Sequence, residues 1–320
     1  MKTVKEAARW LLDRDHFLIL THRRPDGDAV GSALALCLGL RSIGKDAWIW
    51  ANPQFTARHE PRMAGLTRQD LAEDAVIVAV DLASEGLLPF GGEQFAGKTG
   101  LCLDHHPSNT GYAAETLVQE ECAACGELIY DLLLELGVQV NRDMAEALYI
   151  AVSTDSGCFR YSNTTARTLR TAAATVECGA VIRPLNRELF EVKSLGRLQL
   201  EARMLAGMEF FPCQYGKVAI CCAPQSWIEE LQLNEDEIDS LAGFPGSISG
   251  VRLAALIRDS EPGRGKISLR SSEYYNASDV CRRLGGGGHA AAAGASVPGT
   301  LEDAKQALIA VLKAEGIILS

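Results

Sequence analysis

The first half of the chain alternates short, continuous runs of apolar residues with longer segments of helical periodicity. Four such runs lie at Phe17–Thr21, Ala47–Ala51, Ala75–Asp81 and Gly100–Asp104. Runs of this length without polar alternation are typical of strands that are buried on both faces. Because helical or loop segments separate them, they predict a parallel α/β sheet.

Helices are expected between and after these strands. An opening helix is predicted at residues 3–14, and another begins after the turn Pro25-Asp26-Gly27-Asp28. Two more are predicted at Cys125–Leu136 and Asp143–Thr154, so that the second of them delivers Asp155 at its end.

The second half of the chain has a different pattern. Residues 186–207 are charged and helical in periodicity, which predicts a helical connector. Strand-like runs follow at Lys217–Cys222, Val251–Arg258 and Lys266–Arg270. A chain of 320 residues is about twice the usual domain size. We therefore expect a first domain at 1–185, a linker at 186–207 and a smaller α/β domain at 208–320.

Acidic residues and histidines stand where the predicted strands end. His22, Asp26 and Asp28 follow the first strand, and Asp81 ends the third. Carboxylates packed this closely repel one another unless a cation or protons neutralise them. Taken singly, an Asp-Gly turn with a capping carboxylate explains Asp26 and Asp28 equally well, and a lone strand-terminal aspartate such as Asp81 is more often a helix cap or turn former.

The triplet Asp104-His105-His106 is more specific, because consecutive histidines follow a buried strand in a chain with only six histidines. Imidazoles beside carboxylates suit transition-metal ligation. Asp155 adds a fourth acidic position. Ligands bind beyond the carboxyl ends of the strands in open α/β sheets, so these residues are expected to converge. Together these residues are enough to ligate two divalent cations, and a pair of such cations catalyses in-line phosphoryl displacement.

These four positions resemble motifs I to IV of the DHH phosphoesterase superfamily, which is named for its Asp-His-His triplet. The segment Gly285-Gly286-Gly287-Gly288-His289 with Ala292-Ala293-Gly294 resembles the signature of the companion DHHA1 domain. The two signatures fall in the expected order and cover essentially the whole chain. The compact DHH–DHHA1 pattern is similar to the NrnA-type branch, which is related to the RecJ exonucleases.

The resemblance implies a role for each residue. His22, Asp26 and Asp81 would hold one metal, and Asp28, Asp81, His105 and Asp155 the other, with Asp81 as the bridge. Asp104 would orient an imidazole, a common role of carboxylates beside metal-bound histidines. His106 would face the scissile phosphate. The active site is implied to lie in the cleft between the two domains.

A substrate-binding role is expected for residues of the second domain. Consecutive glycines, Gly286, Gly287 and Gly288, allow close backbone approach and can present N–H groups to an anion, and His289 adds a side chain. Arg270 matches a phosphate-binding arginine of the family, and Ser271 could extend the same pocket. On its own the glycine run is equally explained by a tight turn into a helix of small residues.

The implied activity is hydrolysis of very short RNA, roughly two to five nucleotides, or of 3′-phosphoadenosine 5′-phosphate, by hydroxide attack. Two Mn²⁺ ions fit the mixed histidine and carboxylate ligands best, and Mg²⁺ or Co²⁺ are candidate substitutes. A phosphodiesterase acting on linear or cyclic dinucleotides, such as cyclic di-AMP, stays open as an alternative. A non-catalytic nucleotide sensor is a remote alternative, because every metal position is intact.

Charge and composition restrict the possible ligands and the expected cellular location. The net charge of −10 argues against long duplex DNA as the main ligand, but a small phosphorylated substrate is compatible with it. No apolar run approaches the length of a membrane span, and no signal-peptide pattern is seen, so a cytoplasmic protein is expected. The ten cysteines suit reduced thiols, Cys122 and Cys125 included. A homodimer is compatible with the sequence.

Overall fold

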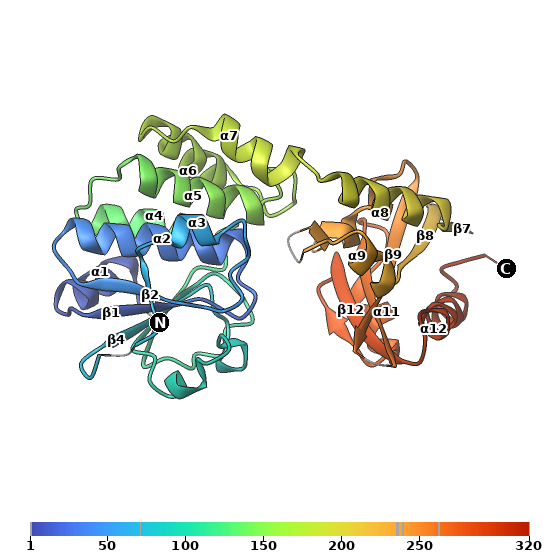
Figure 1. Ribbon diagram of the computed structural model, residues 1–320, viewed down its shortest axis with the longest axis horizontal. Coiled ribbons are helices and arrows are strands. Elements are labelled where there is room, and N and C mark those ends of the chain that lie inside the picture. Colours follow the sequence, from blue (N-terminus) through green and yellow to red (C-terminus); the bar gives the residue numbers. More distant parts are fainter. Residues whose placement is uncertain (1, 71, 235–236, 239, 262, 320) are drawn as a thin grey trace. The chain divides into compact units, whose positions relative to one another are not determined.

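A computed structural model describes residues 2–70, 72–234, 237–238, 240–261 and 263–319. The chain divides into two compact units, Met1–Val192 and Lys193–Ser320 (Figure 1). Each unit has its own six-stranded sheet and its own hydrophobic core. The expected two-domain α/β architecture is therefore confirmed.

The first unit is built on a parallel sheet, as predicted. Its strands lie in the order β3 (Thr67–Arg68), β2 (Ala47–Trp50), β1 (Phe17–Leu20), β4 (Val76–Val80), β5 (Leu101–Asp104) and β6 (Glu115–Val118). The strand order reverses direction between β1 and β4. In an open α/β sheet such a reversal opens a crevice at the carboxyl ends of the two strands.

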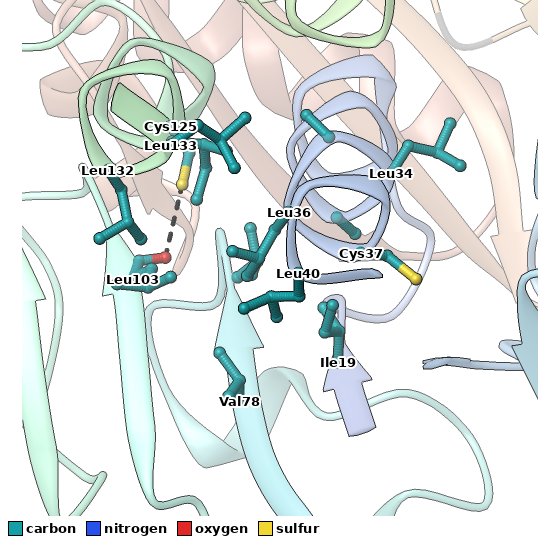
Figure 2. Close-up of a cluster of buried hydrophobic side chains, with 14 of the residues drawn as sticks. Ile19, Leu34, Leu36, Cys37, Leu40, Val78, Leu103, Cys125, Leu132 and Leu133 are labelled. Atoms are coloured by element: carbon teal, nitrogen blue, oxygen red, sulfur yellow. Dashed lines mark hydrogen bonds between the residues drawn. The ribbon is translucent and has the colours of Figure 1, made fainter. Parts of the chain in front are cut away.

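One face of this sheet is covered by helices. The helices next to the sheet are α1 (Val4–Leu12), α2 (Gly27–Ser42) and α4 (Cys125–Glu135), with the short α3 (Glu60–Met63) beside them. A second layer of α5 (Arg142–Asp155), α6 (Ala166–Glu177) and the short α7 (Ile182–Asn186) packs on these helices, farther from the sheet (Figure 1). Helix α2 is buried along most of its length because it lies between the sheet and α5. Figure 2 shows Leu36 and Leu40 of α2 among Ile19, Val78 and Leu103 of three strands.

The opposite face of the sheet is covered by irregular segments and two short 3-10 turns, η1 (Glu85–Leu87) and η2 (Glu93–Phe95). Leu18 and Leu20 point to this side and pack with Trp50 and Phe95, whereas Phe17 and Ile19 point to the helices. This alternation explains the continuous apolar runs, since both faces of β1 are buried.

Close packing of the helices depends on glycines. A Cβ atom on Gly31 of α2 would lie 2.3 Å from the carbonyl oxygen of Ala147 in α5, and one on Gly126 of α4 would lie 2.6 Å from the Ala151 side chain. Helix α5 therefore approaches both α2 and α4 more closely than larger residues at these positions would permit.

The expected connector, residues 186–207, contains helical turns at both ends with a break between them. A π-helical turn, η3 (Arg187–Glu191), ends at Val192, which is extended, and α8 (Leu195–Ala206) begins after Ser194 caps the amide of Arg197. A serine that accepts from the third amide of a helix is a strong start signal, so the break falls there.

The second unit has a mixed sheet in the order β11 (Gly287–Gly288), β12 (Ala292–Pro298), β10 (Arg264–Ser271), β9 (Val251–Glu261), β8 (Gly216–Ala223) and β7 (Glu209–Cys213). Only β8 and β9 are parallel among these described pairs. The elements around the sheet are α8, α9 (Gln225–Glu230), η4 (Ser240–Gly243), η5 (Pro245–Ser247), α11 (Ala277–Arg283) and α12 (Leu301–Ala314).

The residues after His289 form a turn and the strand β12, so the alternative of a helix of small residues is wrong. Ala293 and Ala295 are buried between neighbouring strands and α12, where larger side chains would not fit. Among the described residues, no helix is both long and apolar enough to cross a membrane.

Candidate metal centre

The predicted ligands come from the switch point of the parallel sheet. His22 follows β1, Asp81 follows β4 and Asp104 ends β5, so the three strands deliver them to one edge. Helix α2 contributes Asp26, its N-cap, and Asp28 in its first turn, and Asp155 is the last residue of α5. The structure brings all of these residues together.

The first cluster contains His22, Asp26 and Asp81, with one ligand atom of each within 4.8 Å of the others. The Nε2 atom of His22 lies 3.6 Å from Oδ2 of Asp81 and 3.9 Å from Oδ1 of Asp26. The opposite nitrogen, Nδ1, donates to the carbonyl oxygen of Arg23 at 2.7 Å. Because a carbonyl only accepts, the proton stays on Nδ1 and the lone pair of Nε2 faces the carboxylates.

The second cluster contains Asp28, His105 and Asp155. The Nε2 atom of His105 lies 3.6 Å from Asp28 and 3.5 Å from Asp155, and it also lies 3.5 Å from Oδ1 of Asp81. Its Nδ1 atom is bonded at 3.1 Å to the carbonyl oxygen of Cys122. His105 is thus held in the same tautomer as His22, with its lone pair aimed at three carboxylates.

These clusters fit divalent cations. A lone pair surrounded by carboxylate oxygens is repulsive unless a positive charge lies between them. Ligand atoms that share an ion at about 2.1 Å lie roughly 3.0–3.5 Å from one another, close to the separations around His105. The two oxygens of Asp81 face different histidines, and its Oδ1 is buried without a hydrogen-bond partner. Asp81 could therefore bridge two ions.

The backbone at Asp81 is strained, with a φ of 55°. This left-handed conformation is uncommon for a residue other than glycine and costs about 1–3 kcal/mol, so the surroundings must enforce it. Its amide donates to the carbonyl oxygen of Leu103 at 2.9 Å, which keeps the chain in line with β5 while the side chain turns into the crevice.

Burial raises the pKa of Asp28 and Asp81 well above the usual range, and neighbouring carboxylates raise it further. Burial likewise raises the pKa of Asp155 to about 7, with Asp26 as the next cause. Burial lowers the pKa of His105, and nearby His106 adds to this. The three carboxylates with raised pKa values surround the imidazole of His105, an arrangement in which a bound cation would favour the ionised form of each carboxylate.

Asp28 is oriented by the start of α4. Its Oδ2 accepts from the amide of Cys125 at 2.6 Å, and its Oδ1 accepts from the amide of Gly126 at 3.0 Å and from the hydroxyl of Ser32 at 2.9 Å. A helix N-terminus stabilises a carboxylate through its unpaired amides and its dipole. The side chain of Asp26 is fixed similarly, by the amides of Asp28 and Ala29.

Asp104 is fully buried and belongs to neither cluster. Its oxygens accept from the His105 amide at 2.8 Å, from Nδ1 of His106 at 2.8 Å and from the side chain of Asn109 at 2.6 Å. Burial would raise the pKa of Asp104, but the bonds from His106 and Asn109 lower it overall. The carboxylate therefore stays ionised, and the imidazole that it orients is that of His106.

His106 is the more exposed of the two adjacent histidines and borders a cavity of about 480 Å³. The hydrogen bond to Asp104 raises the pKa of His106. Asp81, His105 and His106 also form a third group within ligand distance. However, Nδ1 of His106 is engaged by Asp104, so this atom is not free to bind a cation.

In the second unit, the predicted substrate-binding residues lie on adjacent strands. Arg270 pairs with Ala292 of β12, and Ala292 comes just after the turn that contains His289. The residues Arg270 and His289 are both exposed. The hydroxyl of Ser271 is already bonded, to the carbonyl oxygen of Tyr275 at 2.5 Å. Ser271 therefore shapes the loop after β10.

The glycines before His289 differ in their surroundings. A Cβ on Gly286 would lie 2.1 Å from the carbonyl oxygen of Gly294, and Gly288 has a φ of 139° and lies against Ala293. A Cβ on Gly287 would meet no atom within 4 Å. Two of the three glycines are thus needed for packing on β12, and Gly287 lies in open space.

Comparison with known proteins agrees with this geometry. Residues 16–152 match the DHH family, N-terminal domain, and residues 216–315 match the DHHA1 domain. The bifunctional oligoribonuclease and PAP phosphatase NrnA of Thermus thermophilus is 30% identical over 298 residues, 92% of this chain and 88% of that protein. The chain belongs to the DHH family of phosphoesterases. It is accordingly a hydrolase of phosphoester bonds.

Solved structures of the DHH fold match the whole chain. An exopolyphosphatase-related protein from Bacteroides fragilis has a TM-score of 0.86 at 22% identity, covering 98% of this chain and 96% of that one. RecJ of Thermus thermophilus, solved in complex with Mn²⁺, has a TM-score of 0.53 at 14% identity, covering 98% of this chain and 54% of that one. These likenesses confirm the fold.

Several residues that support the DHH site were not predicted. Asn109 and Ser32 hold Asp104 and Asp28, and Asn163 bonds the carbonyl oxygens of both Ala123 and Asp155. Asn109 follows the Asp-His-His triplet closely, which is the one available signal. Asparagine and serine are also ordinary turn and cap residues, so their pattern does not mark them.

Proposed function

We propose that this protein is a Mn²⁺-dependent phosphoesterase that hydrolyses very short oligoribonucleotides, 3′-phosphoadenosine 5′-phosphate, or both, to nucleoside monophosphates. The observation that carries the proposal is the pair of histidine–carboxylate clusters joined by Asp81. The similarity to a relative named as an oligoribonuclease and PAP phosphatase supports the substrate class.

In the proposed site, His22, Asp26 and Asp81 would hold one cation, and Asp28, Asp81, His105 and Asp155 would hold the other. Two divalent cations would supply an attacking water of lowered pKa and neutralise charge on the phosphate oxygens. The protein keeps the ligands in place beforehand. Hydrogen bonds to Arg23 and Cys122 fix the imidazoles, and the start of α4 fixes Asp28.

His106 is proposed to act on the phosphate directly. Its Nδ1–H is held by ionised Asp104, which leaves Nε2 for the substrate. Because that hydrogen bond raises the pKa of His106, the ring carries a proton more readily near neutral pH. A protonated imidazole can bond a phosphate oxygen and give its proton to the leaving oxygen.

The second unit is proposed to bind the part of the substrate that is not cut. The guanidinium of Arg270 forks onto phosphate oxygens, and His289 with the open backbone of Gly287 adds further donors. This proposed division of labour would favour small substrates, since one phosphate would be bound while another is cut.

Manganese suits the mixed nitrogen and oxygen ligands better than magnesium, which prefers oxygen alone. The RecJ structure of the same fold contains Mn²⁺, which supports this choice. All ten cysteines are free thiols, in keeping with a reducing compartment such as the cytoplasm.

A substrate panel tests the proposal. Protein loaded with Mn²⁺ is assayed with 3′-phosphoadenosine 5′-phosphate, with oligoribonucleotides of increasing length, with linear and cyclic diadenylate, and with pyrophosphate. We expect the highest kcat/KM on the mononucleotide or the shortest strands. Equal rates on long RNA and dinucleotides would contradict the proposal, and a preference for cyclic diadenylate would favour the dinucleotide phosphodiesterase instead.

The bridging role is tested by Asp81→Asn. We expect kcat to fall roughly a thousandfold or more, because several kcal/mol of transition-state charge stabilisation would be lost. Asp13→Asn, at an exposed carboxylate after α1, is the matched control and should keep full activity. Full activity of the Asp81→Asn variant would remove Asp81 from the mechanism.

A further inference from the structure

Two tyrosines from distant parts of the second unit form an exposed stack. The rings of Tyr215, in the turn between β7 and β8, and Tyr274, in the loop after β10, lie 4.7 Å apart with an angle of 21° between them. The two residues are 44% and 42% exposed. The guanidinium carbon of Arg252 lies 4.9 Å from the centre of the Tyr274 ring.

Arg252 holds the three groups in one arrangement. Its Nε atom donates to the carbonyl oxygen of Tyr215 at 3.0 Å, and its own carbonyl oxygen accepts from the amide of Ser272 at 3.0 Å. The arginine therefore joins the turn that carries Tyr215 to the loop that carries Tyr274. We name these three residues the tyrosine platform.

The tyrosine platform lies beside the proposed phosphate-binding residues. Arg270 pairs with Ala254 of β9, and Arg252 stands two residues earlier on the same strand. Residues two apart on a strand share a face, so Arg252 and Arg270 are diagonal neighbours, with Cα atoms about 7–8 Å apart. The loop that carries Tyr274 starts after Ser271, next to Arg270 in the chain. The amide of Ala277, which begins α11 after this loop, donates to the carbonyl oxygen of Ala290, next to His289.

We propose that the tyrosine platform binds a nucleobase. This base belongs to the nucleotide that follows the phosphate bound by Arg270, on the side of that phosphate away from the bond that is cut. Exposed aromatic rings next to an arginine are the usual binding surface for unpaired bases, because every base has a stacking face. This inference rests on the proposed function. It adds that the site recognises strands of three or more nucleotides through contacts that a mononucleotide never reaches.

The experiment compares two substrates in the same variants. Tyr215→Ala and Tyr274→Ala are assayed with a triribonucleotide and with 3′-phosphoadenosine 5′-phosphate. We expect kcat/KM on the triribonucleotide to fall about 5- to 100-fold, the range of one lost stacking contact. Activity on the mononucleotide should stay within about twofold of wild type. The variant Tyr274→Trp, which keeps an aromatic ring at this position, should retain the activity on the triribonucleotide that Tyr274→Ala loses.

Phe210→Ala is the matched control, because Phe210 is 43% exposed in the same unit but lies at the far end of β7 from the turn. It should leave both substrates unaffected. A direct readout is the fluorescence of 2-aminopurine at the distal base, which should be quenched on binding to wild type and not to Tyr274→Ala.

An equal loss of kcat/KM on both substrates in the tyrosine variants, or no loss on either, would overturn the proposal that the tyrosine platform binds a base. A wild-type protein inactive on both substrates would instead refute the proposed function.

Discussion

The spacing of α2 and α5 is set by Gly31, and the substitution Gly31→Ala tests whether that spacing matters for catalysis. The added Cβ would lie 2.3 Å from the carbonyl oxygen of Ala147 and 2.8 Å from the amide nitrogen of Ala151. Both are backbone atoms, so no side chain can rotate away. Relief requires the helices to separate by about 1 Å to reach ordinary van der Waals contact.

The sign of the change in the free energy of unfolding on Gly31→Ala shows whether overpacking outweighs the helix propensity of alanine. In an unhindered helix, glycine to alanine stabilises by about 1 kcal/mol. Here overpacking should outweigh this gain and give a net loss of roughly 1–3 kcal/mol, or about 2–12 °C in the melting temperature of a unit of this size. Because α2 carries Asp28 and α5 carries Asp155, a displacement near 1 Å should also lower kcat about a hundredfold.

The assay combines thermal unfolding by circular dichroism with Mn²⁺-dependent kinetics at a temperature where the variant is folded. Gly86→Ala is the control, since its Cβ would come no closer than 3.8 Å to any atom. A variant that is as stable and active as wild type would refute the packing argument. One that is destabilised but fully active per folded molecule would refute the link to the ligand geometry.

Three further predictions concern the site and its supports. Mn²⁺ at about 100 times its dissociation constant should stabilise the wild type by about 2.7 kcal/mol, roughly 5–10 °C in a thermal-shift assay, and Asp81→Asn should lose most of this shift. Asn109→Ala removes a 2.6 Å donor to Asp104 and should lower kcat about 10- to 100-fold with little change in KM, as measured by steady-state kinetics. Arg167→Ala leaves the buried carboxylate of Glu127 unpaired and should cost about 2–3 kcal/mol in urea unfolding, whereas a second change, Glu127→Gln, should recover part of it.

The parallel sheet could be predicted because its central strands are apolar on both faces. Two edge strands could not be, since β3 has two residues and β6, Glu115–Val118, carries few apolar side chains. They are strands because neighbouring backbones offer them hydrogen bonds, a tertiary effect that leaves little trace in the sequence. The edge strand β7 was missed similarly, because exposed aromatics and Pro212 interrupt any alternating pattern.

The convergence of the candidate ligands was predictable from the sequence, and the groups that support them were not. His22, Asp81 and Asp104 end apolar runs, so their convergence follows from the rule that parallel strands end at one edge. The amides that orient Asp28 belong to Cys125 and Gly126, which lie 97 and 98 residues away along the chain. A backbone amide has no residue type, so no pattern in the sequence can identify such a partner.

The glycine run shows how one motif can combine two physical requirements. Sequence reasoning assigned Gly286, Gly287 and Gly288 alike to an anion-binding backbone. In the structure, a Cβ atom on Gly286 or Gly288 would clash with the backbone of β12, and at Gly288 the backbone also has a φ of 139°. Gly287 meets no such restriction, so its lack of a side chain has no explanation in the packing of the second unit. Under the proposed function, a ligand that approaches this backbone would impose the missing requirement, so Gly287 is the glycine of the run that bears most directly on the proposal of substrate binding.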